Sequence, residues 1–396
     1  MSEKKEKTRI LIIHLFVWAH YKAKIYSELY ALVQNNPEVD VKVVQLSISE
    51  GTRTKMGMID WSLHQYPMHV LYRDMLENTP FIGRFLKLLR WVLTYKPHVV
   101  NVQGYFDPAM NLILLYCKMV GIKVIMASDS TELDNPNVGW RESIKRYLVR
   151  KSDGFFCYGT KSADYMVKLG ASKEQILVAN NAVDNQKIEA IHKKAMLERE
   201  KKKEELNMRK FNFIFVGRLI PFKNVVVILE AFRKIHTNSK DWGVIILGDG
   251  VELDKMKEFC SKHALSGVHF ISGKSWFEVP KWFALADVFV LPSYSEPWGL
   301  VANEAMACSL PVIISERCGC AIDLVKEGEN GFVFNPYSVD ELAEKMHFFI
   351  ENTNSLTNMG ESSKQIIQNF SPKIVASEML EGFKKGVHEN RKSKQF

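Results

Sequence analysis

The sequence predicts an α/β protein with two Rossmann-like domains, each built on a parallel sheet that helices cover on both faces. The chain has 396 residues, which is too long for one compact core and suits two domains. Short apolar segments typical of buried strands alternate with segments of helical character, and this alternation predicts parallel sheets. The alternation occurs in two sets, which a Lys/Glu-rich stretch at residues 187–210 separates.

The individual elements follow from apolar runs and helical periodicity. Strands are expected in the first set at Arg9–Val17, Val41–Leu46, His98–Gln103, Lys123–Ala127, Gly154–Tyr158 and Ile176–Asn180. Helices are expected between them at Lys22–Gln34, Phe81–Tyr95, Pro108–Val120 and Arg141–Lys151. Strands of the second set are expected at Phe211–Val216, Gly243–Leu247, Val268–Ser272, Asp287–Leu291, Val312–Ile314 and Phe332–Phe334, and a last helix at Lys373–Val387.

These elements predict where the domains begin and end. Residues 1–185 form the first domain and residues 211–372 the second. A charged linker at 186–210, expected to be a solvated helix, joins them. Residues 373–396 form a C-terminal helix.

Composition and charge are those of a soluble globular protein with an anionic ligand. The chain is 46% hydrophobic and 25% charged, and no window of eighteen residues is apolar and uncharged, so no membrane span is predicted. Its six cysteines are scattered, which favours reduced structural thiols in a cytoplasmic protein. A net charge of +8 suits nucleotide phosphates, an acidic membrane face or, with weaker support, nucleic acid.

Residues 287–314 carry the most informative pattern. They predict a strand, a turn, a helix and a second strand, at Asp287–Leu291, Pro292–Pro297, Trp298–Cys308 and Val312–Ile314, with Ser295 placed to cap the helix. Glu296 precedes the helix N-terminus and Glu304 lies within the helix. The first helical N–H groups attract phosphate, and carboxylates accept hydrogen bonds from vicinal hydroxyls. A ligand with phosphate and sugar would use both features, whereas a stabilised helix dipole and a solvated Glu304 are the alternative.

The amino-acid sequence of this segment resembles a known family motif. Glu296-Pro297-Trp298-Gly299-Leu300, followed by Asn303-Glu304-Ala305-Met306-Ala307, resembles the motif of family-four glycosyltransferases, in which seven residues separate two glutamates. These are retaining enzymes of the GT-B type, with two Rossmann-like domains facing across a cleft. The resemblance covers roughly residues 211–336 well. It implies a nucleotide-sugar donor and a C-terminal helix that crosses back onto the first domain.

Two cations follow the first strand of the second domain. Arg218 and Lys223 start at the carboxyl end of that strand, where open α/β sheets bind ligands. A planar guanidinium and a mobile ammonium both suit phosphate oxygens. A surface ion pair and a solvated helix start are the alternatives. The spacing of the two residues matches the resembling family, which implies that they bind the donor diphosphate.

Glycines after the next two strands are weaker candidates. Gly248 begins a Gly-Asp-Gly triplet, and Val251 stands where the family usually has proline. A plain turn explains the triplet as well as nucleotide binding does. Gly273 lies where the backbone of family members holds the base.

The first domain departs from the family pattern. Its first loop contains Trp18 and His20 instead of glycines, and these residues either shape an acceptor pocket or pack as a buried aromatic and a satisfied histidine. The family's histidine after the Lys123–Ala127 strand is absent. Asp129 is our candidate there for a polar contact to donor sugar or acceptor, and capping of a following turn is the alternative.

The helix at Phe81–Tyr95 has a basic side without acids. At 100° per residue its apolar face contains Phe81, Phe85, Leu88, Leu89 and Val92, and Arg84, Lys87 and Arg90 lie opposite, with Trp91 among them. This arrangement suits either an anionic membrane surface or a core-facing helix with a solvated basic side.

Together, the residues and the resemblance indicate a retaining glycosyltransferase acting on a glycan, lipid-linked or small-molecule acceptor, in cell-surface polysaccharide or glycoconjugate synthesis. Donor contacts are expected from Glu304 to ribose, from Glu296 to sugar hydroxyls, and from the backbone at Trp298, Gly299 and Leu300 to phosphate. A UDP- or GDP-sugar is the expected co-substrate, with no other cofactor and no metal, since no Asp-x-Asp pair follows a strand.

Three alternatives remain open at this point: a GT-B sugar-nucleotide epimerase, a phosphorylase, and a silent sugar-nucleotide-binding subunit. No nucleic acid is expected as a partner, because the basic residues are dispersed. The expected location is cytoplasmic, with possible peripheral contact to the inner face of the membrane.

Overall fold

The computed structural model describes residues 7–51, 59–134, 139–235 and 240–393, and it divides into two compact units. The first unit contains the chain up to Ala182 and from Pro372 onwards, and the second contains Val183–Ser371. The last helix of the chain therefore belongs to the first unit.

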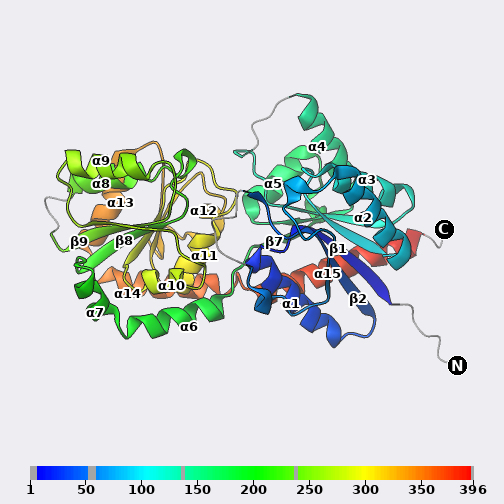
Figure 1. The fold of residues 1–396 in the computed structure, drawn as a ribbon, viewed down its shortest axis with the longest axis horizontal. Coiled ribbons are helices and arrows are strands. Elements are labelled where there is room, and N and C mark those ends of the chain that lie inside the picture. The colour runs from blue at the N-terminus through cyan, green and yellow to red at the C-terminus, as the bar shows by residue number, and fades with distance from the viewer. Residues whose placement is uncertain (1–6, 52–58, 135–138, 236–239, 394–396) are drawn as a thin grey trace. The chain divides into compact units, whose positions relative to one another are not determined.

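The first unit has a seven-stranded sheet in the order β3-β2-β1-β4-β5-β6-β7, in which every neighbouring pair is parallel. Its strands are β1 (Thr8–Phe16), β2 (Val39–Ser47), β3 (Met68–Val70), β4 (Val99–Gln103), β5 (Lys123–Ser128), β6 (Gly154–Cys157) and β7 (Ile176–Ala179). Its α-helices are α1 (His20–Gln34), α2 (Phe81–Tyr95), α3 (Pro108–Met119), α4 (Trp140–Lys151), α5 (Thr160–Leu169) and α15 (Pro372–Ser393). Helices α1 and α15 pack together on one face of the sheet, and α2, α3 and α4 lie on the other (Figure 1).

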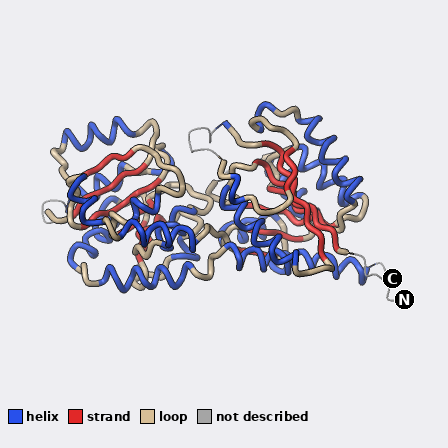
Figure 2. The backbone as a smooth tube through the Cα atoms, turned by 60° about the horizontal axis from the view of Figure 1, so that its bottom comes forward, coloured by secondary structure: helices blue, strands red, loops and turns tan. Residues whose placement is uncertain are grey.

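The second unit has a six-stranded parallel sheet in the order β10-β9-β8-β11-β12-β13. Its strands are β8 (Phe211–Val216), β9 (Trp242–Leu247), β10 (Val268–Ile271), β11 (Val288–Leu291), β12 (Val312–Ser315) and β13 (Gly331–Phe334). Its α-helices are α6 (Asn185–Met196), α7 (Arg199–Glu205), α8 (Val226–Ile235), α9 (Leu253–Lys262), α10 (Val279–Phe283), α11 (Leu300–Ala307), α12 (Ala321–Leu324), α13 (Val339–Glu351) and α14 (Ser355–Ile367). Figure 2 shows that helices flank the strands in each unit.

The predicted fold class, two Rossmann-like domains with parallel sheets, is confirmed. The central strands, such as β4, β8 and β11, are nearly continuous apolar runs and almost fully buried, as expected where helices cover both faces of a sheet. The sequence analysis predicted neither helix α5 nor, among the described strands, β3, which has three residues and lies at the edge of its sheet. Such a short strand carries too little apolar pattern to stand out.

Strand order reverses in the middle of each sheet. In the second unit β9 lies on one side of β8 and β11 on the other, so the chain switches direction between β8 and β11. In the first unit the same switch occurs between β1 and β4. Ligands of open α/β sheets bind at the carboxyl ends of the strands at such a point.

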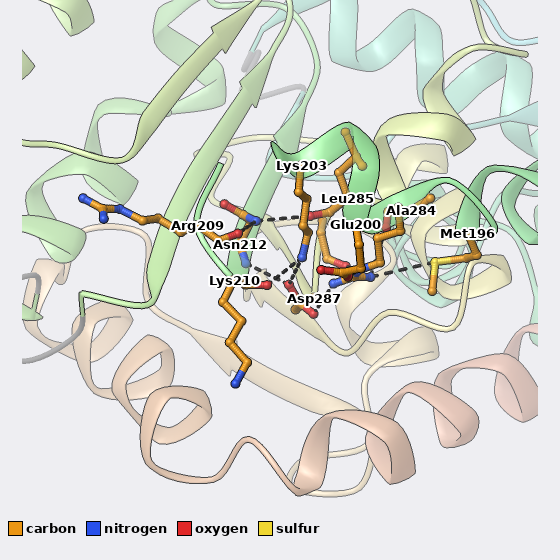
Figure 3. Close-up of polar contacts among 11 residues, drawn as sticks. Met196, Glu200, Lys203, Arg209, Lys210, Asn212, Ala284, Leu285 and Asp287 are labelled. Carbon is orange, nitrogen blue, oxygen red and sulfur yellow. Dashed lines mark hydrogen bonds and ion pairs between the residues drawn. The ribbon is translucent and has the colours of Figure 1, made fainter. Parts of the chain in front are cut away.

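The charged stretch at 186–210 contains α6 and α7, and both helices lie within the second unit. Helix α6 packs against α10 and α11, with Ile188 in the core. Helix α7 is held by Asp287, which immediately precedes β11: Arg199 Nη2 lies 2.5 Å and Lys203 Nζ 3.6 Å from its carboxylate. Figure 3 shows Lys203 and Asp287 meeting in this network. We name it the Asp287 network, with members Arg199, Lys203, Asn212 and Asp287.

Helix α2 has the predicted bounds, but its faces differ from the prediction. Arg84, expected on the solvated basic side, points inward and pairs with Asp107 at 2.8 Å, with both side chains largely buried. Phe81, expected in the core, is 40% exposed. A stripe of Ile82, Leu86 and Leu93 faces solvent instead. The Asp107 carboxylate and two backbone carbonyls bind Arg84. The helix is therefore rotated about its axis relative to the orientation that its apolar periodicity predicts.

Candidate functional site

The site in the second unit begins at the carboxyl end of β8. Gly217 follows the strand and its N–H donates to the carbonyl of Leu247 at 3.0 Å, which continues the pairing with β9. Arg218 comes next and is exposed. Its guanidinium has no hydrogen bond or ion pair to any residue that the structure describes. A planar cation therefore lies at the switch point without a partner from the described chain.

Lys223 and Glu296, 73 positions apart in the sequence, form an ion pair whose side chains are 15% and 17% exposed. Lys223 ends a short 3-10 turn after β8, and Glu296 lies in the loop after β11. Ser293 Oγ lies 3.5 Å from the same carboxylate. The structure thus brings two of the sequence-predicted site residues together at the carboxyl ends of two neighbouring strands.

Backbone and amide contacts hold these two loops in register. The N–H of Tyr294 donates to the carbonyl of Phe222 at 2.9 Å. The buried amide of Asn224 donates to the carbonyls of Pro292 and Pro336, at 3.3 and 2.9 Å. Sequence reasoning missed Asn224 because an asparagine after a turn has no distinctive local pattern. Its role is to position the loops that present Lys223 and Glu296.

Helix α11 starts two residues later than the sequence predicts, at Leu300, and its N-cap is Gly299 instead of Ser295. The backbone of Gly299 has φ +101°, a left-handed conformation that favours glycine and cannot belong to a right-handed helix. Trp298 is 3% exposed, and its indole N–H donates to the amide oxygen of Asn303 at 2.8 Å. Its side chain therefore packs in the core, so only its backbone is available to a ligand.

Glu304 lies in α11, and its carboxylate has no hydrogen bond or ion pair within the described part of the chain. Burial raises the pKa of Glu304 to about 8. The side chain is half-buried, which is less exposed than the solvated alternative on the outer helix face requires. A half-buried acid without a partner among the described residues is unfavourable for the protein alone, and hydroxyl donors from a ligand would satisfy it.

The two glycine candidates already have structural roles. A Cβ on Gly248 would lie 1.8 Å from the carbonyl oxygen of Gly217, so the close approach of the two loops requires glycine. The N–H of Gly273 donates to the Asp249 carboxylate at 2.9 Å. Both contacts join the ends of β8, β9 and β10, which explains these residues without a ligand.

The candidates of the first unit also lie after strands. Asp129 is exposed and directly follows β5. Trp18 is buried, while His20 is half-buried at the start of α1, with the two rings in edge contact at 5.6 Å between centroids. These positions match the packing alternative for Trp18.

The described residues contain neither a cluster of metal ligands nor a helix suited to cross a membrane. No group of three or more His, Cys, Asp and Glu side chains within them is placed to hold a metal ion. No helix among them combines the length and apolar character that crossing a membrane requires.

Part of the chain matches a known protein family. Residues 197–366 match the family described as "Glycosyl transferases group 1". The matched region contains Arg218, Lys223, Glu296 and Glu304. All four therefore lie in the part of the chain that resembles this family.

Curated relatives that are named glycosyltransferases match this chain over part of their length. The chain is 31% identical over 220 residues to glycosyltransferase MJ1178 of Methanocaldococcus jannaschii, covering 55% of this chain and 58% of the relative. It is 25% identical over 260 residues to D-inositol 3-phosphate glycosyltransferase of Rhodococcus jostii, covering 63% and 56%. The chain thus spans less than two thirds of the length of these relatives.

Solved structures of glycosyltransferases share the fold. HepE of Anabaena in complex with UDP has a TM-score of 0.74 and 18% identity, covering 95% of this chain and all of HepE. A glycosyltransferase of Rickettsia africae has a TM-score of 0.74 and 15% identity, covering 96% and 99%. At such identities the likeness establishes the fold alone, and it confirms the predicted GT-B fold class.

Proposed function

We propose that this protein is a glycosyltransferase that moves a sugar from a nucleotide-sugar donor to a hydroxyl-bearing acceptor. The observation that carries the proposal is the cation and carboxylate arrangement at the β8–β11 switch point, within the region that matches group 1 glycosyl transferases. An unpartnered Arg218 and a Lys223–Glu296 pair supply groups for both phosphate and sugar. The match to group 1 glycosyl transferases does not favour an epimerase or a silent binding subunit.

Each residue of the site has a chemical task in this proposal. Arg218 and Lys223 bind the diphosphate and stabilise the charge that develops on it as the glycosidic bond breaks. The N-terminus of α11, at Gly299 and Leu300, adds its partial positive charge. Glu296 accepts hydrogen bonds from sugar hydroxyls while it orients Lys223. Glu304 accepts them from the ribose.

We further propose a UDP-hexose as donor, since HepE has been solved with UDP and with UDP-glucose. A GDP-sugar is the second candidate. By resemblance, transfer retains the anomeric configuration and belongs to family four, and the cations replace a metal. The first unit, with Asp129 and the segment around His20, binds the acceptor. Polysaccharide or glycoconjugate synthesis in the cytoplasm is the setting this chemistry suits.

Donor binding should depend on Glu304. UDP-glucose at about 100 times its dissociation constant should stabilise the wild-type protein by about 2.7 kcal/mol, which thermal unfolding would register as a higher Tm. GDP-mannose and ADP-glucose test the choice of base. In Glu304→Gln, affinity for the preferred donor should fall about tenfold above pH 8, because the ionised carboxylate offers two acceptor oxygens to the ribose hydroxyls and the amide offers one.

The pH dependence of stability provides an internal check on this variant. The raised pKa of Glu304 means that the folded state holds a proton that the unfolded state releases. Its contribution is fully present below the unfolded pKa near 4.5 and is lost as pH rises towards 8. Glu304→Gln should therefore be more stable than wild type at pH 8 without ligand. The exposed Glu258→Gln should match wild type in both tests. Unchanged donor affinity in Glu304→Gln would contradict the ribose role.

We also propose that the first unit touches an anionic membrane surface. The neighbouring helices α2, α3 and α4 expose apolar side chains, and Glu142 is the one acidic residue in their sequences. This α2–α4 surface consists of Ile82, Leu86, Leu93, Leu112, Met119, Trp140, Ile144 and Tyr147. Exposed apolar groups flanked by Lys and Arg suit the headgroup layer of an anionic bilayer. The support is therefore the exposed apolar side chains of these three helices, where the sequence suggested a basic face.

Binding to vesicles tests the α2–α4 surface. Wild-type protein should co-sediment with vesicles of phosphatidylcholine and phosphatidylglycerol, less so with phosphatidylcholine alone, and less at high salt. The double variant Ile82→Ser/Leu86→Ser should bind at least about tenfold more weakly, since burying each side chain contributes about 1.5–3 kcal/mol. Leu197→Ser, which changes an 86% exposed leucine of the second unit, is the matched control. Equal binding by both variants would refute this contact.

A further inference from the structure

Lys22 is a buried cation in the first unit that the proposed chemistry does not yet use. It is the third residue of α1 and is 3% exposed. Its ammonium lies 3.2 Å from the centroid of the Tyr158 ring and 5.2 Å from that of Tyr21. It has no hydrogen bond or ion pair to any residue in the described ranges. By contrast Lys24, two residues later, pairs with Glu28 at 2.9 Å near the surface.

An ammonium in this setting is poorly compensated. Removing a charge from water is costly unless a counter-charge or several hydrogen bonds replace the lost hydration. The faces of two aromatic rings replace only part of it. Burial accordingly lowers the pKa of Lys22 to about 7, and the nearby Asp129 carboxylate opposes this shift only in part. The two aromatic rings and Asp129 therefore compensate the charge of Lys22 only in part.

The position of Lys22 in the fold is that of a ligand-binding group. Helix α1 begins after β1, Asp129 follows β5, and Tyr158 follows β6. All three therefore lie at the carboxyl edge of the parallel sheet, which includes the β1–β4 switch point. This is the edge at which open α/β sheets take their ligands.

We propose that Lys22 and Asp129 form an acceptor subsite for a sugar or polyol that carries an anionic group, either phosphate or carboxylate. The Lys22 ammonium pairs with the anionic group, and the Asp129 carboxylate accepts a hydrogen bond from a hydroxyl. The phenol of Tyr21, which is half-buried, is a further donor to the anion. The identity of this ligand as acceptor rests on the proposed function, whereas its binding does not.

Thermal unfolding with three probes tests the subsite. Glucose 6-phosphate, glucuronate and neutral glucose are added separately to the full-length protein saturated with UDP, at matched ionic strength. We expect glucose 6-phosphate or glucuronate, but not glucose, to raise the Tm by about 2 °C or more. The more effective anion identifies the group. Lys22→Met should abolish this rise, and Lys24→Met should retain it. In the absence of probe, Lys22→Met should unfold at the same or a higher temperature than wild type, because the buried charge is gone.

A second measurement uses the wild-type protein alone, so it tests the subsite even if Lys22→Met does not fold. Acetic anhydride acylates lysine amines, and mass spectrometry of the wild-type protein gives the rate at each residue. The effective anion should slow acylation of Lys22 by about fivefold or more while the rate at Lys24 stays constant. Lack of protection, a Tm rise that survives in Lys22→Met, or no response to either anion would each overturn the subsite. The response to UDP is measured in the same assay, so loss of donor binding would count against the proposed function alone.

Discussion

Replacing Arg218 with alanine should reduce kcat/KM for glycosyl transfer by a factor of about 10²–10³, with folding intact. The guanidinium lies after β8 at the switch point, exposed and without a partner among the described residues. Its removal therefore breaks no hydrogen bond or ion pair within the part of the chain that the structure describes. The diphosphate leaving group gains negative charge as its bond to the sugar breaks, and a positioned cation is worth about 3–4 kcal/mol at that moment.

Initial rates with saturating acceptor and varied donor measure this effect, and circular dichroism with thermal unfolding checks the fold. Arg233→Ala is the matched control, because it removes an exposed arginine of the same unit from α8 instead of from the carboxyl edge of the sheet. Wild-type rates in Arg218→Ala would show that the diphosphate binds elsewhere.

Glu296→Ala should cause a loss of similar size by two routes. It removes an acceptor for sugar hydroxyls, and it leaves Lys223 without the carboxylate that holds it. A double-mutant cycle separates the routes. If Glu296 only orients Lys223, then Glu296→Ala, Lys223→Ala and the double variant should be equally slow. A double variant that is slower than either single variant would indicate that Glu296 also contacts the sugar. Near-normal transfer in Glu296→Ala would remove it from the site.

The sequence could predict the strands and the switch-point residues because those depend on local patterns. Continuous apolar runs such as Phe211–Val216 have one stable use in an α/β protein, a strand buried on both faces. Residues that follow such strands then meet at one edge of the sheet. Lys223 and Glu296 come together because their strands are neighbours in a parallel sheet. The alternation of strands and helices in the sequence predicts such a sheet.

Side-chain orientation could not be predicted, because it depends on partners distant in sequence. Arg84 points inward because Asp107 accepts its hydrogen bond, and the packing around α11 leaves Glu304 half-buried. The sequence did contain a pattern that marks Lys22 as unusual. It continues the buried side of α1 at helical spacing with Tyr26, Leu29 and Val33. A lysine on such a stripe is unusual enough to mark a candidate site.

Asp287→Ala should destabilise the second unit by about 3–5 kcal/mol without any direct effect on ligands. Asp287 is the carboxylate that α7 and the adjacent strand share. It is 10% exposed, pairs with Arg199 and Lys203, and accepts the backbone N–H of Asn212 at 2.8 Å. Without it, Arg199 and Lys203, themselves 17% and 5% exposed, lose the buried carboxylate they share, and the counter-charge that Arg199 keeps is the exposed Glu200 at 3.6 Å. Breaking a buried pair by removing one partner is far more costly than losing a surface pair.

The matched control is Asp340→Ala, which removes a carboxylate of the same unit that is 84% exposed and pairs with Lys234. It should change stability by no more than about 0.5–1 kcal/mol. In thermal unfolding, Asp287→Ala should lower the Tm of the second unit by about 10 °C, and Asp340→Ala should leave it nearly unchanged. If the two variants behaved alike, the stretch at 186–210 would act as the solvated linker that its composition suggests. A large difference would mean that its charges hold α7 against the second sheet, because Arg199 and Lys203 share one buried acid.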